Sequence, residues 1–388
     1  MITLGSLGKF ENIGVDKKIV EGEQTVTLLN FVDIFNHKYI DSSIPSMSVT
    51  ASDKKIVSCD VKRGDIFVTP SSETPDDIGH SAVILEDLEN TVYSYHIMRF
   101  RLNNPDMIAA FYINYLFDTE SVKKQIQKKA KGLTRFGLSK DAFASIEIPF
   151  PTSEMQESLV HKLDSFISLI SKLDEEVELR LLQFEHYRER LLTFENNSNT
   201  EIKFISDVAK NYTGLTYKPD NVSDSGTLVL RSSNILDDKL LFEDNVYVQM
   251  TIPERATAKK DDILICVRNG SKRLVGKCAM ITEEAEGMAF GAFMTVLRAE
   301  KNHPKYLYYV WQSDKVRKQY KGDEAMPIAQ ITSKDFQRIK IPVPSIEEQI
   351  RIVSLLDVFE TCIRKLEEER DLRQKQYEYY REKLLTFE

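Results

Sequence analysis

Two groups of basic side chains are the clearest chemical feature of the sequence. Lys and Arg residues gather in segment 123–135 and again in segments 259–273 and 315–321. Such groups commonly cover a solvated helix surface, but ammonium and guanidinium groups also pair with phosphate oxygens. Because the groups fall at equivalent places of an internal repeat described below, phosphate contacts are favoured. The candidates for these contacts are Lys123, Lys124, Lys128, Lys131, Lys315, Arg317, Lys318 and Lys321.

The sequence contains none of the motifs that mark the common catalytic and cofactor sites. It lacks GxGxxG and GxxxxGK[ST], the glycine-rich phosphate loops, and also HExxH and GxSxG. Asn104-Pro105-Asp106 and Pro75-Asp76-Asp77 are similar to fragments of methyltransferase and nuclease motifs. The rest of each motif is missing, so both are interpreted as turns. The six histidines are scattered, and we therefore assign no catalytic residue and no metal ligand.

Length and composition indicate a globular chain of more than one domain. The 388 residues exceed what one ordinary core supports, so two or more domains are expected. The net charge of −8 argues mildly against nucleic acid, but segments 1–147 and 197–341 carry −3 and +3, which cancel. The sequence shows no long apolar run, no secretory signal and no CxxC pair among its four cysteines. These features predict a cytoplasmic protein that does not contact the membrane.

One internal repeat with a period of 193 residues organises the sequence. Segment 146–195 begins IEIPFPTSEMQ and ends YRERLLTFE, while segment 339–388 begins IKIPVPSIEEQ and ends YREKLLTFE, and 27 of the 50 aligned residues are identical. A period this long excludes solenoids and propellers. It predicts two copies of one unit, each with a globular part and a tail. The predicted boundaries are 1–147, 148–196, 197–341 and 342–388.

Each tail is predicted to be one long helix. The prolines of IPFP and IPVP mark an extended segment before the helix, and Thr152, Ser153 or Ser345 are candidate N-caps. Apolar residues then recur at steps of three and four, the rhythm of a coiled coil. About 44 residues would span roughly 66 Å. The residues predicted to pack are Leu163, Phe166, Ile170, Leu173, Leu356, Phe359, Ile363 and Leu366.

The most direct way to bury the two apolar stripes is against each other. The prediction is an antiparallel coiled coil with one globular unit at each end, related by an approximate two-fold axis. The second tail is more polar in its middle, where Arg370 and Gln374 lie on the stripe. The alternative is that the two helices stay apart and each buries its stripe in another protein.

The globular parts are predicted to be α+β, with mostly antiparallel sheets. The β-rich runs VKRGDIFVTP and HIMRFRL of the first part match AKKDDILICVRNG and AFMTVLR of the second. Each part then carries one amphipathic helix rich in aromatic and basic residues, over 107–132 and 305–322. Gly132 and Gly322 are the candidate C-caps of these helices.

Three features together resemble the DNA-specificity (S) subunit of type I restriction–modification systems. They are the two I-x-I-P-x-P-x-x-E-x-Q signatures, the long helices that end in Y-R-E-[RK]-L-L-T-F-E, and a [KR]-x-[GD]-D-I-[FL] strand in each globular part. The resemblance covers the whole chain in the order that the family has. It implies two target-recognition domains joined by helical spacers, in a non-catalytic protein that reads a split double-stranded DNA target.

The resemblance also implies partners and cofactors. Two methyltransferase (M) subunits would dock on the helices, and motor–endonuclease restriction (R) subunits would join them. S-adenosylmethionine, ATP and Mg would be bound by these partners, so this chain would hold no cofactor of its own.

With DNA as the expected ligand, the polar loops after the D-I strands are predicted to read base edges. In the major groove, Arg pairs favourably with guanine and Asn with adenine. Arg268 and Asn269 fit these pairings, and Glu73 could accept a hydrogen bond from cytosine. The candidates for base contacts are Thr69, Ser71, Ser72, Glu73, Arg135, Arg231, Asn234, Arg268, Asn269, Ser271, Lys272, Arg273 and Gln330.

The same residues leave three alternatives open. The chain could be a non-catalytic coiled-coil adaptor between proteins, the specificity subunit of a methylation-only system, or a bilobed enzyme acting on a small ligand. The sequence shows no motif for the enzyme. Two divergent globular parts beside nearly identical tails favour exchangeable recognition over a simple adaptor.

Overall fold

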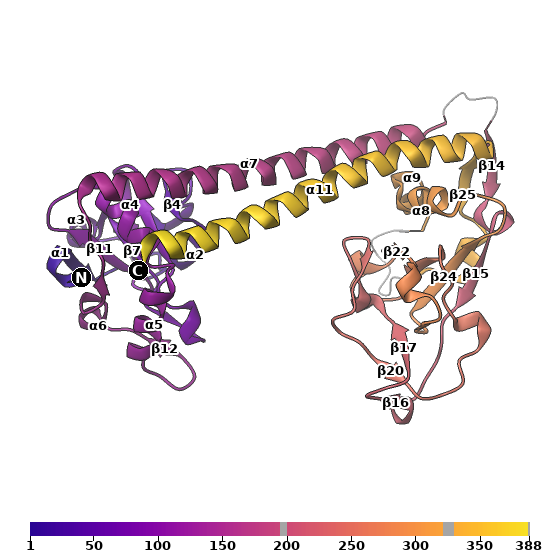
Figure 1. Cartoon of the computed structure of the whole chain (residues 1–388), viewed down its shortest axis with the longest axis horizontal. Coiled ribbons are helices and arrows are strands. Elements are labelled where there is room, and N and C mark those ends of the chain that lie inside the picture. Colours follow the sequence, from indigo (N-terminus) through magenta and orange to yellow (C-terminus); the bar gives the residue numbers. More distant parts are fainter. Residues whose placement is uncertain (195–199, 321–329, 387–388) are drawn as a thin grey trace. The chain divides into compact units, whose positions relative to one another are not determined.

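Two compact units make up the structure, which is a computed structural model (Figure 1). The described residues are 1–194, 200–320 and 330–386. Unit 1 contains Met1–Asp174 and the chain from Glu368 onward, and unit 2 contains Glu175–Glu367. Each unit therefore takes one globular part together with one half of each tail. The domain boundaries predicted from the repeat separate the globular parts from the tails, whereas the two units each combine both. These boundaries stay a prediction.

Unit 1 is built on two mixed sheets. One sheet has the strand order β2-β11-β7-β9-β4 and the other β5-β3-β10-β6, and only the β4–β9 and β3–β10 pairs are parallel within them. The strands are β1 (Ile2–Thr3), β2 (Gly8–Glu11), β3 (Gln24–Leu29), β4 (Tyr39–Ile40), β5 (Met47–Ala51), β6 (Asp60–Val61), β7 (Ile66–Val68), β8 (Ser71–Ser72), β9 (Ser81–Ile84), β10 (Leu88–Tyr93), β11 (Met98–Leu102), β12 (Phe136–Gly137) and β13 (Glu147–Ile148). The helices before the first tail are α1 (Leu4–Leu7), α2 (Phe31–Asn36), α3 (Asp53–Ser58), α4 (Met107–Leu116), α5 (Glu120–Lys129) and α6 (Lys140–Ala144).

Unit 2 repeats this plan with smaller sheets. One sheet has the order β15-β24-β21-β22 and the other β16-β20-β17-β23, with β17–β23 as the parallel pair. The strands are β14 (Glu201–Phe204), β15 (Ala209–Thr213), β16 (Val222–Ser223), β17 (Thr227–Leu230), β18 (Ile235–Leu236), β19 (Lys239–Leu240), β20 (Tyr247–Val248), β21 (Ile263–Cys266), β22 (Cys278–Met280), β23 (Ala289–Phe290), β24 (Met294–Ala299) and β25 (Lys340–Val343). The helices before the second tail are α8 (Pro304–Gln312), α9 (Asp314–Tyr320) and α10 (Ser333–Phe336). The predicted α+β class with mostly antiparallel sheets is confirmed.

Both tails are long helices, as predicted: α7 (Ser153–Leu192) and α11 (Ile346–Leu385). In unit 1 the two helices run antiparallel (Figure 1), because Phe166 stacks on Tyr380 at 5.6 Å between ring centres while Arg370 lies 3.5 Å from Asp174. The prediction that the helices pack on each other is thus confirmed within this unit. No helix among the described residues is long and apolar enough to cross a membrane.

Three of the eight predicted packing residues are buried, and the other five are half-buried. Leu163 and Leu356 are fully buried and Ile363 is 7% exposed. In unit 2, Phe359 stacks on Tyr187 at 5.2 Å between ring centres. The half-buried members of the set are Phe166, Ile170, Leu173, Phe359 and Leu366.

The predicted single helix of each globular part is in fact two helices. In unit 1 the break lies at Thr119, whose hydroxyl donates to the Leu116 carbonyl and accepts from the Val122 N–H. In unit 2 the hydroxyl of Ser313 takes the same role between α8 and α9. A hydroxyl that bonds the backbone in this way ends one helix and caps the next.

The structure tests one of the two predicted glycine C-caps. Helix α5 ends at Lys129 and Ala130 is its C-cap, so the prediction for Gly132 is wrong. Gly322 lies outside the described residues.

The I-x-I-P…Q signature has the same role in both units. Its second isoleucine is buried in a two-stranded pair, where Ile148 faces Ile2 in unit 1 and Ile341 faces Lys203 in unit 2. The glutamine is also buried, and its side-chain amide folds back to the carbonyl of a signature proline. This hydrogen bond is 2.8 Å for Gln156 and 3.0 Å for Gln349. The signature therefore joins each sheet to the first turn of a long helix.

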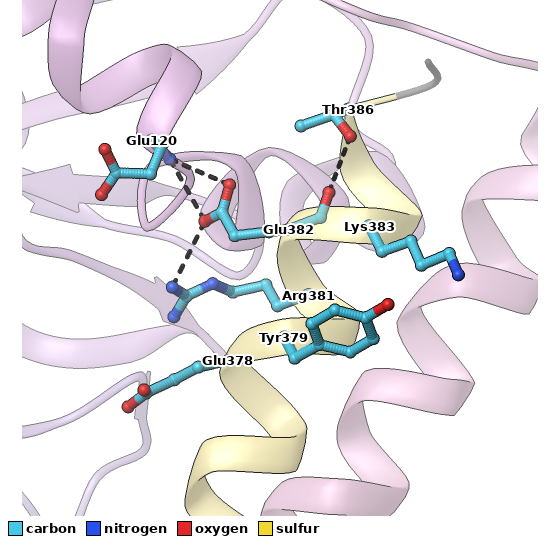
Figure 2. Close-up of a pocket in the computed structure, with 7 residues that line it drawn as sticks. All are labelled: Glu120, Glu378, Tyr379, Arg381, Glu382, Lys383 and Thr386. Atoms are coloured by element: carbon cyan, nitrogen blue, oxygen red, sulfur yellow. Dashed lines mark hydrogen bonds and ion pairs between the residues drawn. The ribbon is translucent and has the colours of Figure 1, made fainter.

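The glutamate of the Y-R-E motif accepts hydrogen bonds from the start of a short helix in both units, which accounts for its presence in both repeats. Figure 2 shows the carboxylate of Glu382, near the end of α11, facing the first turn of α5. Both of its oxygens lie 3.2 Å from the backbone nitrogen of Glu120. In unit 2, Glu189 near the end of α7 accepts from the backbone N–H of Asp314 in the same way, at 3.1 and 3.2 Å. Each long helix thus ends by capping the short basic helix of a globular part.

We expect Glu382→Ala to lower the free energy of unfolding by about 1 kcal/mol, since an N-terminal N–H of α5 loses its acceptor. Urea unfolding of the chain measures this change. Glu378→Ala is the matched control, because Glu378 lies one turn earlier and accepts from Gln374 on its own helix. Its cost is expected to be below about 0.5 kcal/mol. Equal losses in the two variants would contradict the capping role.

Candidate nucleic-acid interface

A buried Asp–Arg ion pair holds the strand from which each predicted base-contact loop begins. In unit 2, the Arg298 guanidinium of β24 donates to both carboxylate oxygens of Asp262, at 2.7 Å each. In unit 1, Arg101 of β11 does the same to Asp65, at 2.6 Å each. Both aspartates are 1% exposed. The pair accounts for the aspartate of the D-I motif and fixes β7 and β21 to their neighbouring strands.

Burial and hydrogen bonding shift pKa values in these pairs, and in unit 1 Arg101 also pairs with Asp60 at 3.2 Å. Burial raises the pKa of the Asp65 carboxyl, and the hydrogen bonds from Arg101 act in the opposite direction. The same hydrogen bonds raise the pKa of Arg101, and those to Asp262 raise the pKa of Arg298. Each guanidinium stays charged beside its carboxylate. These aspartates are therefore structural, and the predicted base-contact residues lie in the loops beyond them.

Segment 267–273 of unit 2 brings several predicted base-contact residues together. Arg268 pairs with Gln330 in an isolated antiparallel bridge. The Asn269 side chain donates to the Ser232 hydroxyl at 3.1 Å and accepts from the Ser271 N–H at 3.0 Å, so its orientation is fixed. Arg268, Ser271, Lys272, Arg273 and Gln330 are exposed, and Asn269 is half-buried.

Segment 70–73 of unit 1 is the counterpart. Ser71 follows Asp65 by six residues, as Arg268 follows Asp262. Ser71 pairs with Gly137 in the short β8–β12 ladder, which Ser72 completes. The Arg135 guanidinium lies 3.4 Å from the Ser71 hydroxyl. Arg135 and Glu73 are exposed and the two serines are half-buried.

Three of the predicted base-contact residues are placed differently from the others. Thr69 and Asn234 are fully buried, so the prediction that they reach a base edge is corrected. Asn234 accepts from the Arg231 N–H at 2.9 Å and donates to the Leu241 carbonyl at 3.0 Å, which closes a turn. Arg231 is half-buried and its guanidinium pairs with Asp244 at 2.7 Å. Asn234 and Thr69 therefore serve the fold.

Most of the predicted phosphate contacts lie on two short helices, α5 in unit 1 and α9 in unit 2. In unit 1, Gln127 of α5 donates to Asp76 at 2.7 Å, which joins the helix to the loop after Glu73. In unit 2, Trp311 of α8 donates to the Gly276 carbonyl at 2.9 Å. The exposed bases are Lys124, Lys128, Lys131, Lys315 and Lys318, and the half-buried ones are Lys123 and Arg317. Lys321 lies outside the described residues.

The sequence prediction missed an aromatic ring beside Arg268 and a second ring at the equivalent sequence position of unit 1. Phe293 lies just before β24, is 56% exposed, and has the Arg268 guanidinium 5.3 Å from its ring centre. His96 lies at the corresponding position before β11. It follows Ser71 by 25 residues, as Phe293 follows Arg268. This shared spacing is the sequence signal that could have identified the two rings. It becomes visible only when the two globular parts are aligned on their Asp–Arg pairs.

Other ligand sites are not evident in the described parts of the chain. No three His, Cys, Asp or Glu side chains among them are grouped so that they could hold a metal ion. A shallow hollow in unit 1 is lined by charged residues near the end of α11 (Figure 2), and Glu382 within it already caps α5. The predicted absence of a metal and of a cofactor stays a prediction.

Comparison with known proteins identifies the family. The sequence model of the type I restriction modification DNA specificity domain matches twice, at residues 36–179 and 197–373. The chain belongs to this specificity-domain family. The suspected family resemblance is thereby confirmed.

Curated relatives from the specificity-domain family match over shorter stretches. The specificity subunit of the type I restriction enzyme StySPI from Salmonella potsdam is 32% identical over 160 residues, which are 39% of this chain and 34% of the relative. The EcoR124I/EcoR124II specificity subunit from Escherichia coli is 52% identical over 64 residues, 16% of each chain. The chain thus spans about a third or less of the length of these relatives.

Two solved structures from type I restriction–modification systems share the fold. A structure that concerns complex assembly and conformational transition of the type I R-M system gives a TM-score of 0.65 at 15% identity, covering 99% of this chain and 95% of that chain. The S subunit from M. genitalium gives 0.52 at 15% identity, covering 100% and 96%. The predicted fold class of two recognition domains with long helices is confirmed.

The Asp–Arg pair predicts a large stability effect for this specificity-domain chain. Asp262→Ala should lower the free energy of unfolding by about 3 kcal/mol, because Arg298 loses its partner while its side chain is only 22% exposed. Thermal or urea unfolding measures the loss.

Glu283→Ala is the matched control in the same unit. Its pair with Lys260 spans 3.6 Å between solvent-exposed side chains, so the cost is expected to stay below about 1 kcal/mol. A comparable loss in the control would contradict the assignment of the Asp262 pair as the anchor.

Proposed function

We propose that the chain is the DNA-specificity subunit of a type I restriction–modification complex and reads a bipartite double-stranded DNA target. Each unit contacts one half-site through its loop segment, 70–73 or 267–273, and the neighbouring basic helix contacts the phosphates. The observation that carries the proposal is the recurrence of this arrangement. Both units place an arginine-bearing polar surface at the same point of the fold, beyond a buried Asp–Arg pair.

The two surfaces differ in their side chains, which fits two different half-sites. Segment 267–273 offers Arg268 and Asn269, which suit guanine and adenine in the major groove. Segment 70–73 offers hydroxyls and the Glu73 carboxylate, which suits the amino group of cytosine, with Arg135 beside them. A shared frame with different side chains is what separate readout of two sequences requires.

The long helices carry the partner surface in this proposal. Leu179 of α7 and Leu372 of α11 occupy the same repeat position and are 56% and 61% exposed. An apolar residue that is exposed at the same place in both helices favours two copies of one partner, which are the two methyltransferase subunits. Restriction subunits would join through the assembled complex.

Chemistry belongs to the partners in this proposal. The chain is non-catalytic, and S-adenosylmethionine, ATP and Mg are bound by the methyltransferase and restriction subunits in the cytoplasm. The absence of catalytic motifs from the sequence supports this division. The purified chain is accordingly expected neither to methylate nor to cut DNA.

Genome-wide mapping of methylated adenines, with and without this gene, tests the function. A bipartite methylated motif that depends on the gene is expected. In the double variant Arg268→Ala and Arg273→Ala, one half of the motif should relax or weaken by about 10-fold or more while the other half stays unchanged, since each arginine–guanine pair contributes about 1–3 kcal/mol.

Lys260→Ala is the control for that experiment, because Lys260 is an exposed base of the same unit that pairs with Glu283. It should leave both halves of the motif intact. An unchanged set of methylated adenines after removal of the gene would contradict the proposed function. A uniform loss of both halves in the arginine variant would place its effect on folding.

The partner surface gives a further expectation. Leu179→Asp with Leu372→Asp should prevent assembly with the methyltransferase subunit, measured by size-exclusion chromatography of the co-expressed proteins. The free energy of unfolding should change by less than about 0.5 kcal/mol, because both side chains are exposed. Leu236→Asp, at a residue 55% exposed in β18, is the control and should assemble normally. Full assembly of the double variant would contradict this surface.

A further inference from the structure

An exposed phenylalanine next to the best base-contact candidate has no evident role in the fold. Phe293 is 56% exposed. Its backbone carbonyl is used, because it accepts from the N–H groups of Val267 at 2.9 Å and Arg268 at 3.3 Å. The ring itself stands outside the core, and it faces the Arg268 guanidinium at 5.3 Å. The backbone therefore fixes the position of a ring whose free face points to solvent.

The guanidinium of Arg268 is available for an external contact. Within the described parts of the chain, Arg268 makes no salt bridge, whereas Arg231, Arg298 and Arg101 all pair with acids. Stacking on a ring restricts the guanidinium plane and leaves its N–H edge open. This is the state in which an arginine can donate two hydrogen bonds to one planar acceptor pair.

Unit 1 has a ring at the same position. His96 follows Ser71 by 25 residues, as Phe293 follows Arg268, and its ring lies 4.0 Å from that of the exposed Tyr95. Partial burial lowers the pKa of His96, and the charges of Lys17 and Arg135 lower it further. The charge of an arginine thus acts on His96 as well, although Arg135 and Arg268 come from different segments.

We propose that Phe293 and Arg268 form one base-reading pair, in which Arg268 bonds a guanine and the free face of Phe293 packs on the methyl group of an adjacent thymine. The inference rests on the proposed function and names a specificity-determining residue within that site. Guanine presents O6 and N7 to a bidentate arginine, and thymine presents its methyl group in the same groove. Two neighbouring bases thus match the two parts of the pair.

The alternative chemistry for an exposed ring is stacking on an extruded or single-stranded base. The arginine already occupies one face of the ring, and its N–H edge suits a guanine that remains in the duplex. The observations therefore favour major-groove contact over stacking.

The experiment uses the assembled complex and duplexes that carry the methylated motif, with one thymine at a time replaced by deoxyuridine. This replacement removes only the methyl group. For the wild-type complex, deoxyuridine at one thymine should lower the affinity for the duplex about five- to tenfold. We expect this thymine to lie next to a guanine in the half-site that depends on Arg268. In Phe293→Ala, affinity for the thymine duplex should fall by about the same factor, and the two duplexes should bind alike.

Val222→Ala is the matched control, because Val222 is 47% exposed in β16 of the same unit. It should keep the wild-type difference between thymine and deoxyuridine. If Phe293→Ala unfolds, Phe293→Gln has a similar length and should likewise lose that difference.

Retention of the full deoxyuridine effect in the Phe293 variant would overturn the proposal, and so would a wild-type complex in which no thymine of that half-site responds. Binding by the wild type without any sequence preference is a different result. It would show that the proposed function itself fails.

Discussion

Burial of the two long helices is the constraint on which the rest of the structure depends. The core of unit 1 includes Leu163 of α7 together with Tyr377 and Leu385 of α11, and the core of unit 2 includes Leu192 of α7 with Leu356 of α11. Each core therefore needs side chains from both repeats, and the sequence repeat is not an independent folding unit. This explains why the tails vary so little between the copies, since one helix must fit a globular part at its first half and the other globular part at its second half.

The globular parts hold two different loop surfaces on the same kind of frame. Asp65 with Arg101, and Asp262 with Arg298, fasten the strands by a bidentate bond that is satisfied within the protein. The bond is independent of the side chains in the loop after the strand. The position six residues beyond the aspartate is Ser71 in one unit and Arg268 in the other. A frame of this kind allows the side chains of the loop to differ between the units without a change in strand packing.

The sequence predicted the features that depend on periodicity and missed those that depend on tertiary hydrogen bonds. The heptad-like stripe located both helices, and short β-rich runs located β7, β11, β21 and β24. The breaks at Thr119 and Ser313 were not predicted, because a mid-helix hydroxyl is common in sequence. The additional acceptors for the helix starts, Glu382 and Glu189, come from residues far away in the chain. Asn234 resembled a loop asparagine, yet its amide closes a buried turn. Phe293 resembled a core residue of a strand, and its exposure could not be read from its type.

Exposure and partnership together separate candidate contact residues from structural ones. Arg101, Arg298 and Arg268 are alike in sequence, but the first two bond buried carboxylates and the third lies against an exposed ring. A guanidinium that is already paired with a carboxylate would have to break that ion pair to bind a base. The free energy lost would be about as large as the free energy gained. An arginine stacked on a ring keeps its hydrogen-bonding edge for a ligand and has already lost part of its side-chain freedom. Arg268 is therefore a better candidate for a ligand contact than Arg101 or Arg298.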